Sequence, residues 1–158
     1  LLLKNNYKTT VGLAIGSSEP AKQWGVQNFI HLIKSIRTNY QSQIVLIGGP
    51  NDYGIARSIK ENFDSPNWIT QAVGLPILEA SAAASLCNIC IGNDTGILHI
   101  AAATGTFSIG LYIASIPQND DPLIKPITPE NITTISTQNI EALTNKMIID
   151  TISTVPGF

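Results

Sequence analysis

Short apolar runs alternate along the chain with longer amphipathic segments. VGLAI (11–15) and IVLIGG (44–49) are uninterrupted apolar runs closed by glycine, a pattern typical of strands that are buried on both faces. After each run, apolar residues recur at helical spacing: Val26, Phe29, Ile30, Ile33 and Ile36 after the first, and Ile55, Ile59 and Phe63 after the second. The pattern predicts two consecutive strand–helix units.

The alternation continues to the end of the chain. It predicts a weak third strand at 67–70, an alanine-rich helix at 77–86, a fourth strand at 88–92, a helix that stops at Gly105, and a fifth strand at 107–112. Residues 113–131 carry four of the nine prolines and are expected to form an irregular loop. A sixth strand near 132–135 and a last helix follow, with apolar positions Ile140, Leu143, Met147, Ile148 and Ile152 before Pro156.

Continuously apolar strands joined through helices imply a parallel sheet with helices on both faces. The predicted fold class is therefore α/β, a Rossmann-like doubly wound parallel sheet of about six strands. In such sheets, ligands bind beyond the carboxyl ends of the strands, where the strand order reverses. The candidate site should lie in four loops, at 16–25, 48–53, 70–76 and 92–99.

Length and charge narrow the class of protein. The 158 residues correspond to one domain, and nine Lys plus Arg against eleven Asp plus Glu leave a net charge of −2, so no nucleic acid partner is expected. We find no apolar run of membrane-spanning length and no signal-peptide pattern, and therefore predict a cytoplasmic protein without a transmembrane segment. Residues 1–10 are expected to be a connector from a missing N-terminal domain, with the domain itself at 11–158.

The two cysteines form a single CxxC, Cys87 and Cys90, without a second pair or a nearby histidine. Zinc takes four ligands, and redox pairs of this spacing begin helices, whereas these cysteines lie where a helix leads into a strand. We interpret them as two buried thiols and expect no metal site.

The first loop combines hydroxyl groups with a lysine. Lys22 follows Ser17 and Ser18, while no lysine or arginine occurs between residues 65 and 124, so Lys22 is the candidate cation for a phosphorylated ligand. A solvated surface lysine is the alternative interpretation. Trp24, close by, is interpreted as a core side chain.

The fourth loop, GNDTGILH (92–99), predicts an anion site at the start of a helix. Asp94 or Asn93 is expected to cap the helix, with Thr95 and Gly96 in its first turn, where free amides attract an anion and glycine admits close approach. A carboxylate beside a phosphate is repulsive, so Asp94 should face elsewhere, for example towards sugar hydroxyls. His99 lies one turn further on, directed either to the cleft or to the core.

Several common signatures are absent from the sequence, namely the P-loop GxxxxGK[ST], the GxGxxG after the first strand and the nucleophile elbow GxSxG. Pattern and spacing alone therefore indicate a nucleotide-type ligand in a doubly wound domain.

GSSEPAKQW, IVLIGGPND and GNDTGILHIAAATG, in this order and spacing, resemble the C-terminal half of glycosyltransferase family 9, which includes the lipopolysaccharide heptosyltransferases. The resemblance runs from about Val11 to Tyr112. It implies the GT-B architecture of two Rossmann-like domains that face a cleft, with this chain as the half that binds the nucleotide sugar.

The resemblance also implies roles for single residues. Ser17, Ser18 and Lys22 match groups that contact the donor's diphosphate, together with the amides at Thr95 and Gly96.

Four further positions match contacts to the rest of the donor or lie near it. Asp94 matches an acid that binds the hydroxyls of the donor sugar, and Leu75 falls where the family packs the base. Asp52 lies one residue away from the sequence position where the family has the acid that binds the ribose, and His99 matches a histidine near the donor.

The implied activity is inverting, metal-independent transfer of a heptose or related sugar from an ADP-sugar to a lipid-linked lipopolysaccharide core acceptor. The acceptor site and the general base would belong to the missing N-terminal domain, so the chain alone should bind donor without turnover. Any membrane association would be peripheral, at the inner face of the bacterial inner membrane. Lys22 and Asp94 would make the leaving-group and sugar contacts. The alternatives are a stand-alone nucleotide-binding module and another GT-B enzyme such as a UDP-sugar epimerase.

Overall fold

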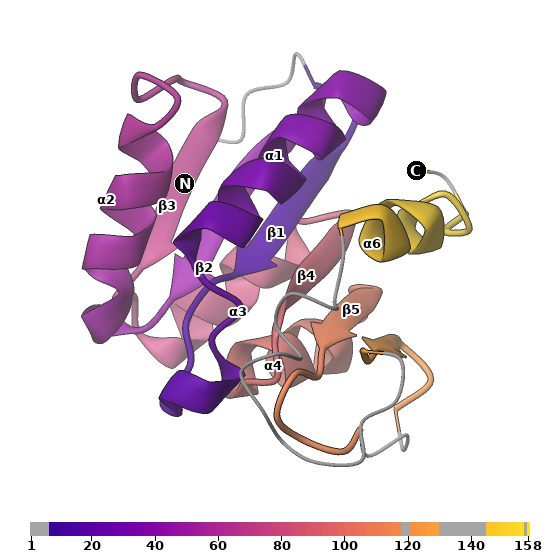
Figure 1. Cartoon of the computed structure of the whole chain (residues 1–158). Helices are drawn as coiled ribbons and strands as arrows, with labels where there is room; N and C mark the ends of the chain where they lie inside the picture. Colours follow the sequence, from indigo (N-terminus) through magenta and orange to yellow (C-terminus); the bar gives the residue numbers. More distant parts are fainter. Residues whose placement is uncertain (1–6, 118–120, 130–144, 157) are drawn as a thin grey trace.

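The computed structural model describes residues 7–117, 121–129, 145–156 and 158. Within these ranges, six parallel strands form one sheet in the order β3-β2-β1-β4-β5-β6 (Figure 1). This order and the flanking helices confirm the Rossmann-like α/β class. The strand predicted at 132–135 and the positions Ile140 and Leu143 of the predicted last helix lie outside the described residues.

The elements follow the predicted alternation. The strands are β1 (Thr10–Ala14), β2 (Gln43–Gly48), β3 (Ile69–Val73), β4 (Ile89–Asn93), β5 (Ser108–Leu111) and β6 (Ile124–Ile127). The helices are α1 (Val26–Tyr40), α2 (Tyr53–Glu61), α3 (Ile77–Ser85), α4 (Gly96–Ala103) and α6 (Asn145–Ile152), with short 3-10 helices η1 (Pro20–Lys22) and η2 (Pro50–Asp52).

Both edge strands differ from the prediction. β3 begins and ends later than 67–70, and β6 lies inside 113–131, which was expected to be an irregular loop. Each edge strand has polar or proline positions, Gln71 in β3 and Pro126 in β6, that weaken the apolar pattern. Among the described residues β6 pairs with β5 alone, and proline is tolerated at such an edge position because its lost N–H group faces no second strand there.

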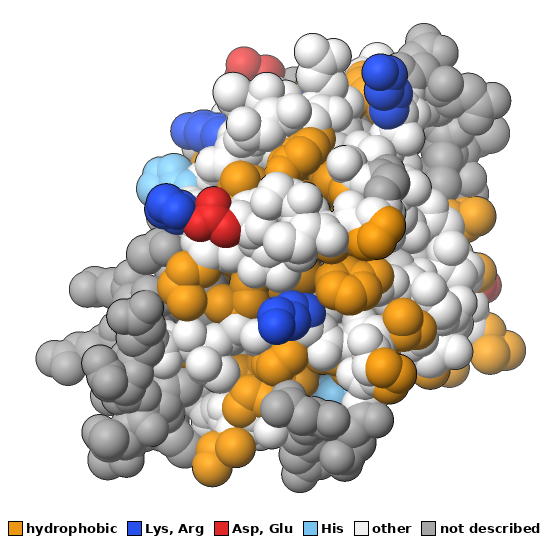
Figure 2. Space-filling view, turned by 90° about the vertical axis from the view of Figure 1, so that its right-hand side faces the viewer, with side chains coloured by type: hydrophobic (Ala, Val, Ile, Leu, Met, Phe, Trp, Pro, Cys, Tyr) orange, Lys and Arg blue, Asp and Glu red, His pale blue; other side chains and the backbone are white. Residues whose placement is uncertain are grey.

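The two faces of the sheet are packed differently. Large side chains of α1, α2 and α6 cover one face, including Phe29, Ile33 and Ile148. The alanines of α3 and α4 cover the other face. Figure 2 looks at the side of the molecule that appears on the right in Figure 1, where hydrophobic side chains lie between separate charged ones.

Two predictions about single core residues are confirmed. Trp24 is 1 % exposed and its ring meets Phe29 edge-on, with 5.2 Å between the ring centroids. Cys87 and Cys90 are free buried thiols, and burial raises the pKa of both, that of Cys87 to about 12. They are therefore protonated packing groups at neutral pH.

The strand order reverses between β1 and β4, which are neighbours in the sheet although they are far apart in the sequence. The chain leaves β1 towards β2 on one side and leaves β4 towards β5 on the other. The loops after β1 and β4 therefore diverge and leave space beyond the carboxyl ends of these strands. The helices η1 and α4 flank these ends at the bottom of Figure 1. No helix in the described ranges has the length and apolar character needed to cross a membrane.

Candidate ligand-binding site

A pocket of about 450 Å³ lies over the carboxyl ends of the central strands. Its lining is Gly16, Ser17, Ser18, Ile47, Gly48, Gly49, Pro50, Asn51, Asp52, Leu75, Ile77, Ala80, Gly96, Ile97 and Ile100. The pocket thus brings together five residues that the sequence proposed separately, from loops after β1, β2, β3 and β4: Ser17, Ser18, Asp52, Leu75 and Gly96.

The two walls of the pocket differ in chemistry. Glycines at the ends of β1 and β2 form one wall, together with the hydroxyls of Ser17 and Ser18. Apolar side chains of α3 and α4, among them Ile77 and Ile97, form the other. The arrangement can hold a flat apolar group against one wall while polar groups meet backbone amides on the other.

A charged cluster adjoins this pocket. Lys22 Nζ lies 2.8 Å from Glu19 Oε1 and 3.4 Å from Asp94 Oδ2. The side chains of Lys22 and Asp94 are only 21 % and 17 % exposed, so Lys22 is not a freely solvated surface lysine. The pair connects the loop after β1 with the loop after β4.

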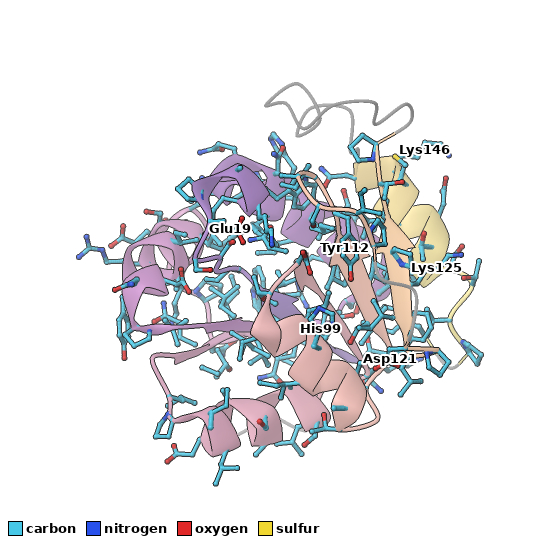
Figure 3. All side chains as sticks on the ribbon, turned by 90° about the horizontal axis from the view of Figure 1, so that it is seen from below. Glu19, His99, Tyr112, Asp121, Lys125 and Lys146 are labelled. Carbon is cyan, nitrogen blue, oxygen red and sulfur yellow. The ribbon has the colours of Figure 1, made fainter. Side chains whose placement is uncertain are left out.

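Asp94 is held by two further groups. Ser115 Oγ donates a hydrogen bond to Asp94 Oδ2 at 2.7 Å, and His99 Nε2 lies 3.4 Å from Asp94 Oδ1. His99 is half exposed, which rules out the interpretation of a core histidine. Figure 3, which views the molecule from below, labels Glu19, His99 and Tyr112 in the region of this cluster.

The environment keeps both members of the ion pair charged. Burial by itself would raise the pKa of Asp94, but hydrogen bonds from Ser115 and His99 and the charge of Lys22 outweigh it, so the pKa is lowered. The hydrogen bond with Glu19 and the charge of Asp94 raise the pKa of Lys22 despite partial burial. Burial also raises the pKa of the nearby Tyr112, and the Asp94 charge adds to this shift.

The start of α4 corrects one prediction. Thr95, rather than Asp94 or Asn93, occupies the N-cap, and Gly96 is the first helical residue. Asp94 does not cap the helix because its carboxylate turns to Lys22 and Ser115. Among the described side chains, Thr95 Oγ1 is a buried hydroxyl without a partner. The first amides of a helix have no intrahelical acceptor, and Gly96 and Ile97 present this turn to the pocket.

Asn93 has a structural role that the sequence did not reveal. Its side chain is fully buried; Oδ1 accepts the backbone N–H of Trp24 at 3.1 Å, and Nδ2 donates to the carbonyls of Ile15 and Gly16 at 3.1 and 3.2 Å. The contacts fasten both ends of the loop that carries Ser17, Ser18 and Lys22. The available signal was a polar residue at the end of an otherwise apolar strand.

Asp52 lies in the pocket between the loops after β1 and β2. It is 9 % exposed, and its Oδ2 accepts the backbone N–H of Gly49 at 2.7 Å. A Cβ atom on Gly16 would lie 2.0 Å from this oxygen, so the carboxylate packs directly against the glycine. One carboxylate oxygen is therefore committed to the loop, and the other makes no hydrogen bond with the described residues.

The fold and the pocket together define a Rossmann-like domain with a ligand site at the switch point of the sheet. The sequence matches the profile of glycosyltransferase family 9 (heptosyltransferase) over residues 4–148. The chain belongs to this family. Among the described residues, no group of three or more His, Cys, Asp or Glu is placed to hold a metal ion.

Individual relatives agree with this assignment. The chain is 31 % identical over 107 residues to lipopolysaccharide heptosyltransferase 2 of Salmonella typhimurium, an alignment that covers 66 % of this chain and 30 % of the relative. Its fold matches the ADP-heptose lipopolysaccharide heptosyltransferase II of E. coli with a TM-score of 0.82 at 23 % identity, covering 96 % of this chain and 47 % of that one.

A second E. coli heptosyltransferase, WaaC, was solved with ADP-2-deoxy-2-fluoro heptose. It matches with a TM-score of 0.76 at 16 % identity, over 96 % of this chain and 44 % of its own. The chain therefore spans less than half the length of these relatives.

Proposed function

We propose that this chain is the donor-binding domain of an inverting glycosyltransferase that transfers a heptose or related sugar from an ADP-sugar to a lipopolysaccharide core acceptor. The observation that carries the proposal is the Lys22–Asp94 pair, which adjoins the pocket at the switch point of the sheet. Family membership supports the choice of donor, as do two related E. coli enzymes: the ADP-heptose lipopolysaccharide heptosyltransferase II, and WaaC, which was solved with ADP-2-deoxy-2-fluoro heptose.

The pocket offers a place for each part of a nucleoside. The base would lie against the apolar wall, with Leu75 and Ile77 beneath it. The ribose hydroxyls would donate hydrogen bonds to the second oxygen of Asp52. A carboxylate accepts hydrogen bonds from hydroxyls, whereas a phosphate has no proton to donate to it.

The diphosphate would lie between α4 and the loop after β1. The first amides of α4 at Thr95 and Gly96 attract an anion, and the hydroxyl of Ser18 supplies a donor from the opposite wall. The Ser17 hydroxyl donates to the Glu19 carbonyl at 3.1 Å and would exchange this bond for the diphosphate. Lys22 would exchange its contact with Glu19 for the diphosphate, since Glu19 is exposed and easily released to water.

The sugar would then reach Asp94. Its carboxylate accepts hydroxyl protons and stays ionised through its contacts with Ser115, His99 and Lys22. This arrangement separates the two anionic partners, because Lys22 stands between the carboxylate and the diphosphate.

In the proposed reaction, an acceptor hydroxyl attacks the anomeric carbon as the bond from that carbon to the diphosphate oxygen breaks. The bonding electrons leave with the nucleoside diphosphate, and Lys22 with the amides of α4 stabilises the growing negative charge. We assign the general base and the lipid-linked acceptor site to an N-terminal domain of the GT-B type, outside this chain. The 158 residues are therefore expected to bind donor without turnover, and no metal or other cofactor is assigned to the step.

The test is calorimetric titration of this chain with ADP, UDP and adenosine, repeated with ADP on Lys22→Ala. Selective ADP binding that weakens at least tenfold in Lys22→Ala is expected, a loss of about 1.4 kcal/mol or more. Lys34→Ala is the matched control, because Lys34 is exposed on α1. A preference for UDP would favour a UDP-sugar enzyme such as an epimerase, and equal losses of ADP and adenosine would reduce Lys22 to a structural role.

A further inference from the structure

The segment after β5 returns to the charged cluster. Ser115 lies beyond the end of β5 at Leu111, and its hydroxyl donates to Asp94 Oδ2 at 2.7 Å. This is a shorter contact than those of Lys22 and His99, which are both 3.4 Å from the carboxylate. The closest partner of Asp94 is therefore a neutral hydroxyl.

The three partners divide the two oxygens of Asp94. Ser115 and Lys22 share Oδ2, while His99 is the one described side chain that approaches Oδ1. Each carboxylate oxygen has two lone pairs, so Oδ2 is fully used and Oδ1 keeps acceptor capacity. After donating its single proton, Ser115 Oγ also keeps lone pairs that can accept from a ligand hydroxyl.

The partners also come from three different elements. Lys22 ends η1, His99 belongs to α4, and Ser115 follows β5. Lys22 is expected to turn to the diphosphate when a donor binds, and His99 is half exposed. Ser115 is a neutral hydroxyl that is not needed for the diphosphate, so it can hold Asp94 in both states.

On the basis of the proposed function, we propose that Ser115 is a positioning residue for sugar recognition. Its hydroxyl holds Asp94 Oδ2 so that Oδ1 faces the hydroxyls of the donor sugar. Ser115 thereby orients the carboxylate and leaves its negative charge in place. A second cation in the same position would neutralise that charge. Base and diphosphate contacts do not pass through Ser115, so its loss affects the sugar part of the donor alone.

The experiment compares ADP with ADP-heptose on the 158-residue chain by calorimetry. Ser115→Ala is expected to weaken ADP-heptose binding about tenfold, the scale of one hydrogen bond to a charged group, and to leave ADP binding within about twofold. Ser115→Thr keeps the hydroxyl and should restore the wild-type ratio. Ser85→Ala makes the same chemical change at the exposed end of α3 and should leave the affinities for ADP and ADP-heptose unchanged.

A second measurement tests the hydrogen bond between Ser115 and Asp94 in the absence of any ligand. Carbon-13 NMR titration of the Asp94 carboxyl, assigned with Asp94→Asn, should show a higher pKa in Ser115→Ala than in the wild type or Ser115→Thr. Among the described residues, Lys22, His99, Glu19 and Tyr112 are the charged or titratable groups that face the cluster, and they are the same in all three chains.

The outcomes separate this proposal from the proposed function. Equal weakening of ADP and ADP-heptose in Ser115→Ala, or an unchanged Asp94 pKa, would overturn the role of Ser115 while the donor site stands. Wild-type chain that binds ADP no better than adenosine would contradict the proposed function, and the role of Ser115 in sugar recognition would fall with it.

Discussion

The backbone N–H of Trp24 donates to the buried side chain of Asn93 across 3.1 Å, which ties the end of the first loop to the end of β4. The Asn93 amide also holds the start of that loop through the carbonyls of Ile15 and Gly16. Lys22 lies between these anchor points. The position of the lysine relative to Asp94 thus depends on a residue that is outside the pocket lining.

Asn93→Ala should destabilise the chain and disturb the first loop. The substitution leaves the buried N–H of Trp24 and the buried carbonyl of Gly16 without their Asn93 partner, and an unsatisfied buried group costs about 1–3 kcal/mol. We expect the free energy of unfolding to fall by about 2 kcal/mol or more in urea denaturation. Asn39→Ala, on the exposed side of α1, should change it by less than about 0.5 kcal/mol. Equal stability of the two variants would contradict this role of Asn93.

Gly96→Ala should separate ligand binding from folding. A Cβ atom at Gly96 meets no protein atom within 4 Å, although the residue lines the pocket. Alanine is a better helix former than glycine, so the thermal midpoint should stay the same or rise. ADP affinity should nevertheless fall at least tenfold in calorimetry, because the methyl group occupies the space above the first amides of α4.

The control for Gly96→Ala is Gly54→Ala. Gly54 lies in the first turn of α2, and a Cβ atom there also meets no protein atom within 4 Å, but the residue is outside the candidate site. The control should leave ADP affinity unchanged. ADP binding that survives Gly96→Ala would place the diphosphate elsewhere.

Stability should fall on acidification partly through Asp94. Its pKa is lowered in the folded chain, so its contribution is present above the ordinary aspartate pKa of about 3.9 and is lost as the pH falls through the lowered value. The raised pKa of Lys22 acts in the opposite direction: its contribution is present below about pH 10.4 and is lost as the pH rises through the raised value.

Asp94→Asn removes the acid contribution and provides the measurement. Urea denaturation between about pH 2.5 and 6 should show a smaller loss of stability on acidification in the variant than in the wild type. Parallel curves for the two chains would mean that Asp94 has no favourable contacts in solution.

The two thiols should be unreactive in the folded chain. Burial raises the pKa of Cys87 to about 12 and raises that of Cys90 as well, so neither forms appreciable thiolate at pH 8. Ellman's reagent should therefore label them in 6 M guanidinium chloride and hardly at all in buffer, on the same timescale. Rapid labelling of the native chain would contradict the packing of Cys87 and Cys90 between α3 and the sheet.

The central strands were predictable because strands that are buried on both faces consist mostly of apolar residues. Strands β1, β2, β4 and β5 are covered on both faces, so nearly every position is apolar and each run is detectable by itself. Among the described residues, the edge strands β3 and β6 have one neighbour each, and they contain Gln71 and Pro126, which weaken the apolar pattern. The loops that follow the central strands were placed correctly for the same reason.

The sequence by itself determined which loops meet at the site, because parallel strands carry the residues that follow them to one end of the sheet. Ser17, Ser18, Asp52, Leu75 and Gly96 meet there as expected. The sequence did not determine the lining of the pocket residue by residue, since Lys22, Asp94, Thr95 and His99 are not among the lining residues.

Only the tertiary structure decided what each polar side chain contacts. Asp94 turns from the helix start to Lys22 and Ser115, and Asn93 turns inward to the first loop. These contacts join residues that are far apart in the chain. Their geometry depends on how neighbouring strands align, and no local pattern records it.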